Sequence, residues 1–321
     1  MRTSPSGNGR LALLGAALVS LIAVPTEARI DFSVLQQAGY GMVEIKRPQP
    51  NVLSVLATIN GRKALLVVDT GWSGEGIAID SEMAASLKIQ PEKSEVVGHT
   101  LSGKKIGVRK GVADTVLLGN VQMRQVPIFF GNFGALHNAS MRRLIGADGF
   151  VSSGFLRTCS GLLDLQNLRL FLRPPGTGKR AMIGQAMRGA GLAEVPFVLS
   201  SNRNAFVDVE INGAAGKMII DTGKALTGVD SRFASKMKVV GYSSRVGTID
   251  AAGAVTQTTL TKIQSFKISG VSLRAPDVRL EEFPVYTETQ GKLIGFLGMD
   301  ILGPNGTIID YGQLKLYFYP L

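Results

Sequence analysis

The order of apolar and polar positions predicts a chain of short β-strands separated by turns. Short apolar segments alternate with glycine-containing turns, which is typical of strands and hairpins. One apolar segment, Leu65–Val68, runs into Asp69-Thr70-Gly71. A second, Lys217–Ile220, runs into Asp221-Thr222-Gly223. A strand followed by an Asp-Thr-Gly loop therefore occurs twice.

The two halves of the chain match each other well beyond these loops. The matching pairs are Ala57–Gly61 with Val209–Gly213, Ile79–Ala84 with Val229–Ala234, Gly149–Val151 with Gly295–Leu297, and Leu163–Phe171 with Ile309–Tyr317. Asp80 and Asp230 occupy equivalent places before a predicted short helix, where an aspartate is a favoured cap. We therefore predict an all-β fold in which one lobe with short helices is used twice.

The predicted domain boundaries follow from this repeat. The first lobe spans residues 52–172, the second spans residues 195–321, and residues 173–194 form a linker. Pro174-Pro175-Gly176 supplies turn-forming residues that suit an exposed connector. Residues 29–51 form an N-terminal arm, which is either a pro-segment or a strand that completes a sheet between the lobes.

The first 28 residues have the composition of a secretory signal peptide. Arg2 and Arg10 precede the apolar run Leu11–Val24, and Thr26 and Ala28 are small residues at the positions expected before a cleavage site. The alternative is an N-terminal anchor helix. No later segment is long enough to span a membrane. We expect a periplasmic or secreted protein that is not stably inserted in the membrane once the signal is removed.

Composition narrows the possible functions. The chain has 321 residues, 45% of them hydrophobic and 18% charged, which is enough for a buried core. Cys159 is the only cysteine, so no disulfide forms within the chain. The net charge of +11 comes from scattered residues, and no basic helix or aromatic platform suggests nucleic-acid binding. His99 and His137 have no metal-ligand spacing, so we expect neither a metal nor a cofactor.

The duplicated loop indicates acid–base chemistry. If two copies of one lobe pack about a pseudo-twofold axis, Asp69 and Asp221 meet near that axis. Two adjacent carboxylates do not both ionise readily, so they share a proton and can activate a water between them. Gly71 and Gly223 would allow close approach. The hydroxyls of Thr70 and Thr222 could tie the loops together, although threonine also simply suits a strand.

These features resemble the retropepsin-like and pepsin-like aspartic peptidases. The resemblance rests on the two apolar-Asp-Thr-Gly segments and on the later segment Phe296–Leu302, and it covers both halves. It implies a β-barrel-like lobe of six to seven strands in each half, a catalytic dyad of Asp69 and Asp221, and an extended peptide or protein substrate. It also implies a monomer with both catalytic loops in one chain, similar to a fused retropepsin dimer.

The resemblance also suggests where substrate binds. Two glycine-containing hairpins, with Gly103 and Gly253 near their tips, could be flaps over the cleft, or ordinary surface hairpins. Trp72, Ser73 and Lys224 follow the catalytic glycines and are predicted to line the first subsites.

Three departures from the family pattern leave alternatives open. Trp72 and Lys224 stand where a small residue is usual, Ala225 stands where Ser, Thr or Asp is usual, and Ser152 replaces the glycine that the second half keeps as Gly298. Lys224 could pair with an acidic substrate, tie up the dyad, or turn outward into solvent. In the second case the chain would be a pseudopeptidase that binds peptides without cleaving them.

Overall fold

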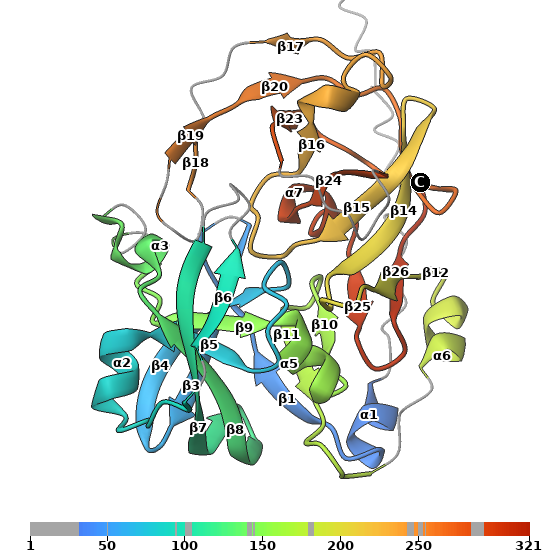
Figure 1. The fold of residues 1–321 in the computed structure, drawn as a ribbon. Helices are drawn as coiled ribbons and strands as arrows, with labels where there is room; N and C mark the ends of the chain where they lie inside the picture. Colours follow the sequence, from blue (N-terminus) through green and yellow to red (C-terminus); the bar gives the residue numbers. More distant parts are fainter. Residues whose placement is uncertain are drawn as a thin grey trace, which may run out of the picture.

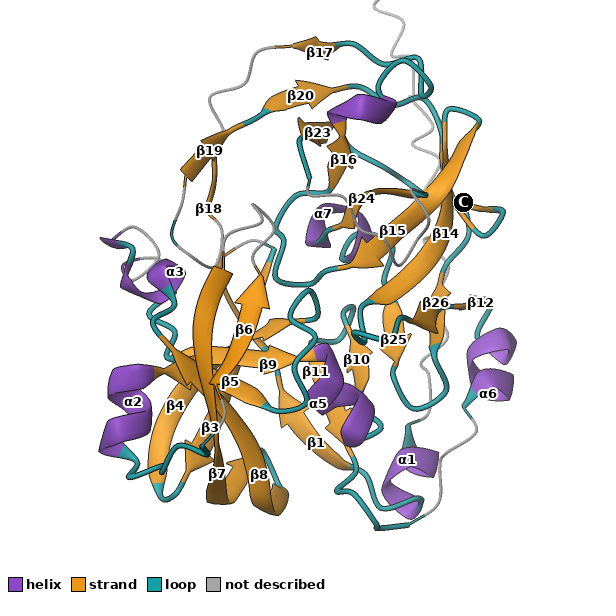
Figure 2. Ribbon diagram, viewed as in Figure 1, coloured by secondary structure: helices purple, strands orange, loops and turns teal. Residues whose placement is uncertain are grey.

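The computed structural model describes residues 32–49, 51–93, 95–99, 105–139, 143, 145–178, 183–242, 247–249, 253, 255–283 and 292–321. These residues form two β-rich lobes joined by a shared sheet (Figure 1). Helices are few and short (Figure 2). The prediction of an all-β fold with two repeated lobes is confirmed.

The first lobe is a barrel-like sheet of eight strands in the order β2-β3-β4-β9-β5-β8-β7-β6. An additional pairing of β3 with β7 closes the barrel. Alternate residues of the long strand β7 are buried, as expected for a strand with one face on a core. The strands are β2 (Lys46–Gln49), β3 (Val52–Ile59), β4 (Arg62–Asp69), β5 (Ile77–Asp80), β6 (Glu95–His99), β7 (Lys105–Leu118), β8 (Val121–Gly131) and β9 (Gly149–Ser152).

The second lobe repeats this plan with shorter strands. Its sheet has the order β17-β20-β23-β16-β24-β15-β14-β21-β22, with β13 also paired to β14, and β18 and β19 form a separate hairpin. The strands are β13 (Val198–Leu199), β14 (Ala205–Ile211), β15 (Ala214–Ile220), β16 (Gly228–Asp230), β17 (Gly241–Tyr242), β18 (Gly247–Ile249), β19 (Val255–Gln257), β20 (Thr259–Thr261), β21 (Phe266–Ile268), β22 (Val271–Ser272), β23 (Val278–Glu281) and β24 (Leu293–Leu297).

A six-stranded sheet with strands from both halves joins the lobes. Its order is β1 (Gly41–Glu44), β11 (Arg169–Leu172), β10 (Leu162–Asp164), β25 (Ile308–Asp310), β26 (Lys315–Phe318) and β12 (Ala193–Pro196). At its centre Leu163 pairs with Ile309. These residues hold equivalent places in the two sequence repeats, so the pseudo-twofold axis passes between β10 and β25.

The arm and the connector are both part of this architecture. Within the N-terminal arm, β1 pairs with β11 in the shared sheet and β2 pairs with β3 of the first lobe. The arm therefore does complete the sheet between the lobes. The expectation of an exposed connector is wrong in part, because Ile183 and Met187 near and within α6 (Gly184–Gly189) are buried in an apolar cluster.

The short helices complete the lobes. Asp80 caps α2 (Ser81–Ser86) through a 2.8 Å hydrogen bond from the Glu82 amide, and Asp230 caps the 3₁₀ turn η1 (Ser231–Phe233) in the same way. The predicted capping roles are therefore confirmed. The other helices are α1 (Ser33–Gln37), α3 (Gly134–His137), α5 (Ser153–Thr158) and α7 (Met299–Leu302). Within the described ranges, no helix has the length and apolar character needed to cross a membrane.

Candidate active site

The two Asp-Thr-Gly loops meet where the lobes face each other. Asp69 ends β4, and Asp221 directly follows β15. Each of these strands pairs in parallel with the later apolar strand of its own lobe, β9 or β24. Buried apolar residues hold both strands in the core, so the two loops are presented from rigid supports.

The two threonines tie the loops together reciprocally. The Thr70 hydroxyl donates to the Ile220 carbonyl at 2.8 Å, and the Thr222 hydroxyl donates to the Val68 carbonyl at 2.7 Å. Each hydroxyl also accepts from the other threonine's amide, at 3.2 Å for the Thr70 amide and 2.9 Å for the Thr222 amide. Both threonines are fully buried. These four bonds are shielded from solvent by this burial, so they fix the loops relative to each other.

Each carboxylate is oriented by amides of its own loop. The Gly71 and Trp72 amides donate to Asp69 Oδ1 at 3.0 and 3.2 Å. The Gly223 and Lys224 amides donate to Asp221 Oδ1 at 2.9 and 3.1 Å. The same two donors act at equivalent positions, so the local geometry of the two aspartates is symmetric.

The glycines bring each loop against the opposite aspartate. A methyl group added at Gly71 would lie 2.6 Å from Asp221 Cγ, and one added at Gly223 would lie 2.5 Å from Asp69 Cγ. Such distances are far below van der Waals contact. The carboxyl groups can occupy their positions only because both loop residues lack a side chain.

Burial and mutual repulsion favour a shared proton. Burial raises the pKa of Asp69, and the charge of Asp221 raises it further. Burial also raises the pKa of Asp221, while the Lys224 ammonium and the loop amides act in the opposite direction. The pair can therefore hold one proton and one negative charge at once, the state needed to activate water and polarise a carbonyl together.

Trp72 and Ser73 extend from the first loop. The Trp72 indole packs edge-on against Phe133, with the ring centroids 5.6 Å apart. It also lies beneath strand β6, because a methyl group at Gly98 would be 3.3 Å from Trp72 Cη2. Its Nε1 is buried without a hydrogen-bond acceptor among the described residues. Ser73 is half-buried, and its carbonyl packs closely against Gly154 in α5.

Lys224 lies inside the second lobe. Its ammonium is 2.6 Å from Glu281 Oε2, and the two side chains are only 5% and 8% exposed. The ring centroid of Phe283 is 5.6 Å away and that of Phe296 is 6.0 Å away. The alternative of an outward, solvated lysine is therefore wrong, because Glu281 and the aromatic rings hold the ammonium in the interior. The ion pair is also with Glu281 rather than with either aspartate.

Ser152, which departs from the family pattern, has a structural place. It is fully buried, donates to the Gly76 carbonyl at 2.7 Å and accepts from the Phe155 amide at 2.9 Å. In the second lobe the same loop is held by Thr227, which donates to Asp300 at 2.6 Å and accepts from the Gly298 amide. Ser152 therefore fastens the loop behind the site.

The two candidate flaps differ in how much of each is described. Strands β6 and β7 form the hairpin of the first half, and its tip, with Gly103, lies outside the described residues. In the second half β18 pairs with β19. Gly253, in the turn between them, has a positive φ, and a methyl group there would lie 2.9 Å from the backbone of Gly134 in α3. The second hairpin therefore reaches across to the first lobe.

Sequence reasoning missed two residues near the site. Glu281 is the partner of Lys224, and Tyr311 is a buried residue whose hydroxyl lies near Thr70 and both aspartates. Comparing the halves position by position could have found both. Tyr311 aligns with Leu165, and Glu281 aligns with Gly131 through the equivalent pairings of β16 with β23 and of β5 with β8.

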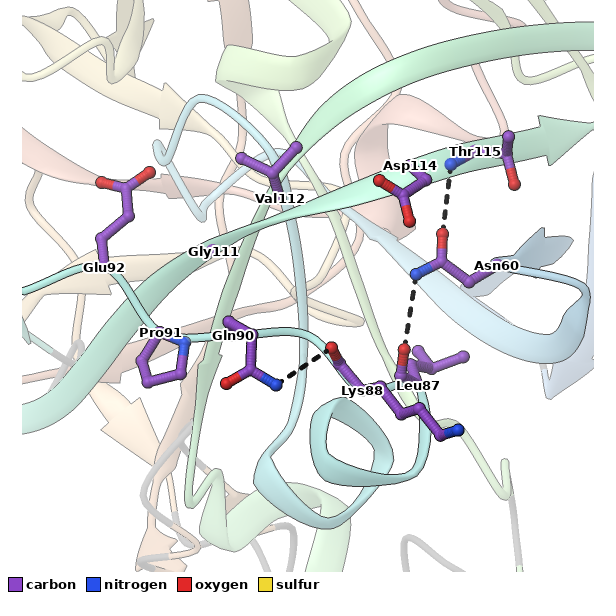
Figure 3. A pocket seen from close by; sticks show the side chains of 10 residues that line it. All are labelled: Asn60, Leu87, Lys88, Gln90, Pro91, Glu92, Gly111, Val112, Asp114 and Thr115. Carbon is purple, nitrogen blue, oxygen red and sulfur yellow. Dashed lines mark hydrogen bonds between the residues drawn. The ribbon is translucent and has the colours of Figure 1, made fainter.

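A surface pocket lies far from the dyad. Figure 3 shows its lining, which includes Asn60, Leu87, Gly111 and Thr115. Asn60 donates to the Leu87 carbonyl and accepts from the Thr115 amide. Asn212 makes the corresponding bonds to Met237 and Ser265 in the second lobe. The pocket lies around the hairpin turn at Asn60, and this turn recurs at Asn212 in the second lobe. It is at the opposite end of β4 from Asp69, so it does not contribute to the chemistry of the two aspartates.

Comparisons with known proteins bear on this arrangement. The sequence model of the aspartyl protease family matches residues 55–148 and again residues 207–301. No curated protein matches. Among solved structures, a retropepsin-like aspartic protease from Rickettsia conorii is 16% identical, with a TM-score of 0.26, over 42% of this chain and 89% of that one.

The two segments matched by the family model together make up more than half of the chain, and each contains one Asp-Thr-Gly loop. One segment contains β4 of the first lobe, and the other contains β15 of the second lobe. This chain therefore belongs to the aspartyl protease family, whose sequence model matches it once in each of its two repeated lobes.

Proposed function

We propose that this protein is an aspartic endopeptidase that hydrolyses peptide bonds at Asp69 and Asp221. The observation that carries the proposal is the reciprocal threonine tie, which holds the half-buried Asp69 and the buried Asp221 against each other in one chain. Burial raises the pKa of both carboxyl groups, so a shared proton is retained. That arrangement supplies a base and an acid to the same water and carbonyl.

The reaction needs no covalent intermediate. The ionised carboxylate takes a proton from water as the water oxygen bonds to the scissile carbonyl carbon, and the protonated carboxyl donates its proton to the carbonyl oxygen. In the second step the newly formed carboxyl protonates the amide nitrogen as the C–N bond breaks. A hydroxyl of the tetrahedral species returns a proton to the other aspartate, which restores the starting state.

The substrate we propose is an extended peptide with an apolar side chain beside Trp72. The Trp72 indole, Phe133 and Phe150 form an aromatic series, with Phe133 and Phe150 5.7 Å apart. Such surfaces favour apolar and aromatic side chains. A Trp72→Ala variant should therefore broaden the side chains accepted in cleavage of a peptide library, and an unchanged preference would remove Trp72 from the binding surface.

The function is tested by incubating the mature protein with a diverse peptide library across pH. Asp69→Asn and Asp221→Asn should each lower kcat/KM by about 10²–10⁴-fold, because each removes one partner of the acid–base pair. Asp114→Asn, the same change on the exposed face of β7, should leave turnover at the parental level. Peptide binding without cleavage in the parent protein would instead support a pseudopeptidase.

Export is a further part of the proposal, and the segment concerned, residues 1–28, lies outside the described residues. We propose a periplasmic or secreted monomer from which this segment has been removed. N-terminal sequencing of the native protein should find Arg29 first. A cytoplasmic protein that retains Met1 would contradict export without affecting the assignment of the dyad.

A further inference from the structure

The position after the catalytic glycine differs between the lobes, while its aromatic support is kept. In the first lobe Trp72 packs on Phe133, which packs on Phe150. In the second lobe Phe283 packs on Phe296 with centroids 4.8 Å apart, and the Lys224 ammonium lies over both rings. A neutral indole on one side of the dyad is thus replaced by a cation on the other.

The second lobe is built to hold this cation. Glu281 lies 2.6 Å from it, whereas the equivalent place in the first lobe is Gly131. Gly228 leaves room for the pair, since a methyl group there would lie 2.7 Å from Glu281 Oε2 and 2.9 Å from Lys224 Cε. Burying a charge is costly unless the charge has a partner, and Glu281 supplies that partner for Lys224.

The cation is not fully cancelled by its partner. Arg279 Nη1 lies 3.8 Å from Glu281 Oε1, so two buried cations face one carboxylate. Asp300 also acts on Arg279, but burial raises the pKa of Asp300 and so favours its neutral form. On its other sides Asp221 faces Asp69 and the neutral phenol of Tyr311, whose pKa burial raises. The field from the second lobe at Asp221 is therefore positive.

We propose that the buried Lys224–Glu281 pair makes the two aspartates inequivalent, so that Asp221 is the ionised base and Asp69 is the proton donor. This inference rests on the proposed function. Lys224 belongs to the loop of Asp221 and donates its backbone amide to that carboxylate at 3.1 Å, and the charge of its ammonium opposes the rise in the pKa of Asp221. Lys224 and Glu281 are positioning residues, because they act on the reaction only through Asp221.

The experiment compares the pH dependence of kcat/KM in two variants, one that removes a positive charge and one that removes a negative charge. The quantity measured is the position of the acid limb, the part of the profile in which kcat/KM falls at low pH. Lys224→Met removes the cation, so Asp221 ionises less readily and the acid limb moves to higher pH, by about 1 unit. Glu281→Gln removes the compensating anion, so the field at Asp221 strengthens and the acid limb moves to lower pH.

The opposite signs separate an electrostatic role from a structural one. Damage to packing lowers activity in both variants without moving the limb in opposite directions. Trp72→Phe is the matched control: it changes the equivalent position in the first lobe without changing charge, and its acid limb should stay in place. The proposal would be overturned if the acid limb stayed in place in both Lys224→Met and Glu281→Gln, or if it moved in the same direction in both.

Two further measurements keep the test independent of folding and of activity. If Lys224→Met folds poorly, Lys224→Gln removes the same charge while keeping a polar group that can hydrogen-bond Glu281. Its acid limb should also rise. In protein labelled with ¹³C at aspartate carboxyl groups, the first ionisation should appear at Asp221. A first ionisation at Asp69 would refute the inference, whereas absent hydrolysis with ionisation at Asp221 would refute only the proposed function.

Discussion

In the first lobe the residue after the Asp-Thr-Gly glycine is Trp72, which packs on Phe133 beneath strand β6; in the second lobe it is Lys224, which is buried against Glu281. The parts that hold the carboxyl groups do not differ in this way. Threonine hydroxyls, loop amides and loop glycines act identically on both sides. The lobes have thus kept the symmetry that positions the aspartates and lost it at the residues immediately beyond.

This contrast separates two demands on the site. Placing two carboxyl groups within contact of each other requires matched loops, because any displacement on one side acts on the carboxyl of the other. The extended peptide that we propose as substrate would impose no such match, since a peptide has direction and presents different side chains to each lobe. Substitutions at the loop threonines and glycines should therefore have similar effects in both lobes. Substitutions at Trp72 and Lys224, the residues after the glycines, should have different effects.

The largest effect is expected from the loop glycines. Gly71→Ala and Gly223→Ala each place a methyl group against the opposite aspartate, and displacement of a catalytic group by about 1 Å can cost about 100-fold in rate. We expect both to lower kcat/KM by at least about that factor. Gly189→Ala, with open space around the added methyl, should retain parental turnover. Strongly unequal losses in the two loops would show that the site is less symmetric than its geometry.

The next effect concerns the residues after the glycines. Lys224→Ala leaves Glu281 buried without its lysine, and breaking a buried ion pair typically costs about 3–5 kcal/mol of unfolding free energy. Urea unfolding should show this loss. Lys224→Met/Glu281→Met should recover most of it, because no unpaired carboxylate remains. A lysine variant as stable as the parent would mean that the ammonium contributes nothing to the second lobe.

The threonine tie should again be symmetric. Thr70→Val and Thr222→Val each leave a buried carbonyl and a buried amide without their partners, at a cost of about 1–3 kcal/mol of unfolding free energy. The two losses should agree closely. Thr58→Val, near the end of β3, serves as the control and should unfold at the parental urea concentration. A loss confined to one threonine would break the comparison.

The smallest effect is expected at Tyr311, which replaces the Leu165 of the first half. Its hydroxyl is buried beside Thr70, whose own hydroxyl already donates to the Ile220 carbonyl. Tyr311→Phe should therefore change the unfolding free energy by less than about 1 kcal/mol. It should also leave the acid limb of the pH profile in place, since a neutral phenol carries no charge to act on Asp221. A clear shift of that limb would place Tyr311 within the proton-sharing group.

The sequence predicted the repeated parts well. Apolar strands entering Asp69 and Asp221 recur with the same flanking hairpins, so the duplication, the β-rich lobes and the aspartate caps could be inferred from pattern alone. The pairing of Leu163 with Ile309 follows from the same alignment, because equivalent residues meet at a pseudo-twofold axis. Repeated short-range patterns are readable in a sequence because each copy is evidence for the other.

What lies outside the repeat was harder to predict. The outward, solvated alternative for Lys224 is wrong because its partner, Glu281, is 57 residues further along the chain and becomes its neighbour only through the strand order of the second lobe. The sequence also left open whether the arm completes the sheet between the lobes, and the pairing of β1 with β11 shows that it does.

The sequence by itself determined the two Asp-Thr-Gly loops, their strands and the pseudo-symmetric relation between them, because local propensity and repetition carry that information. Only the tertiary structure decided how the halves diverge. It places the Lys224 ammonium in the interior, Glu281 beside Gly228, and the Tyr311 hydroxyl next to Thr70. A buried charge is stable only beside a suitable partner, and the packing of strands that are distant in sequence decides which residue that partner is.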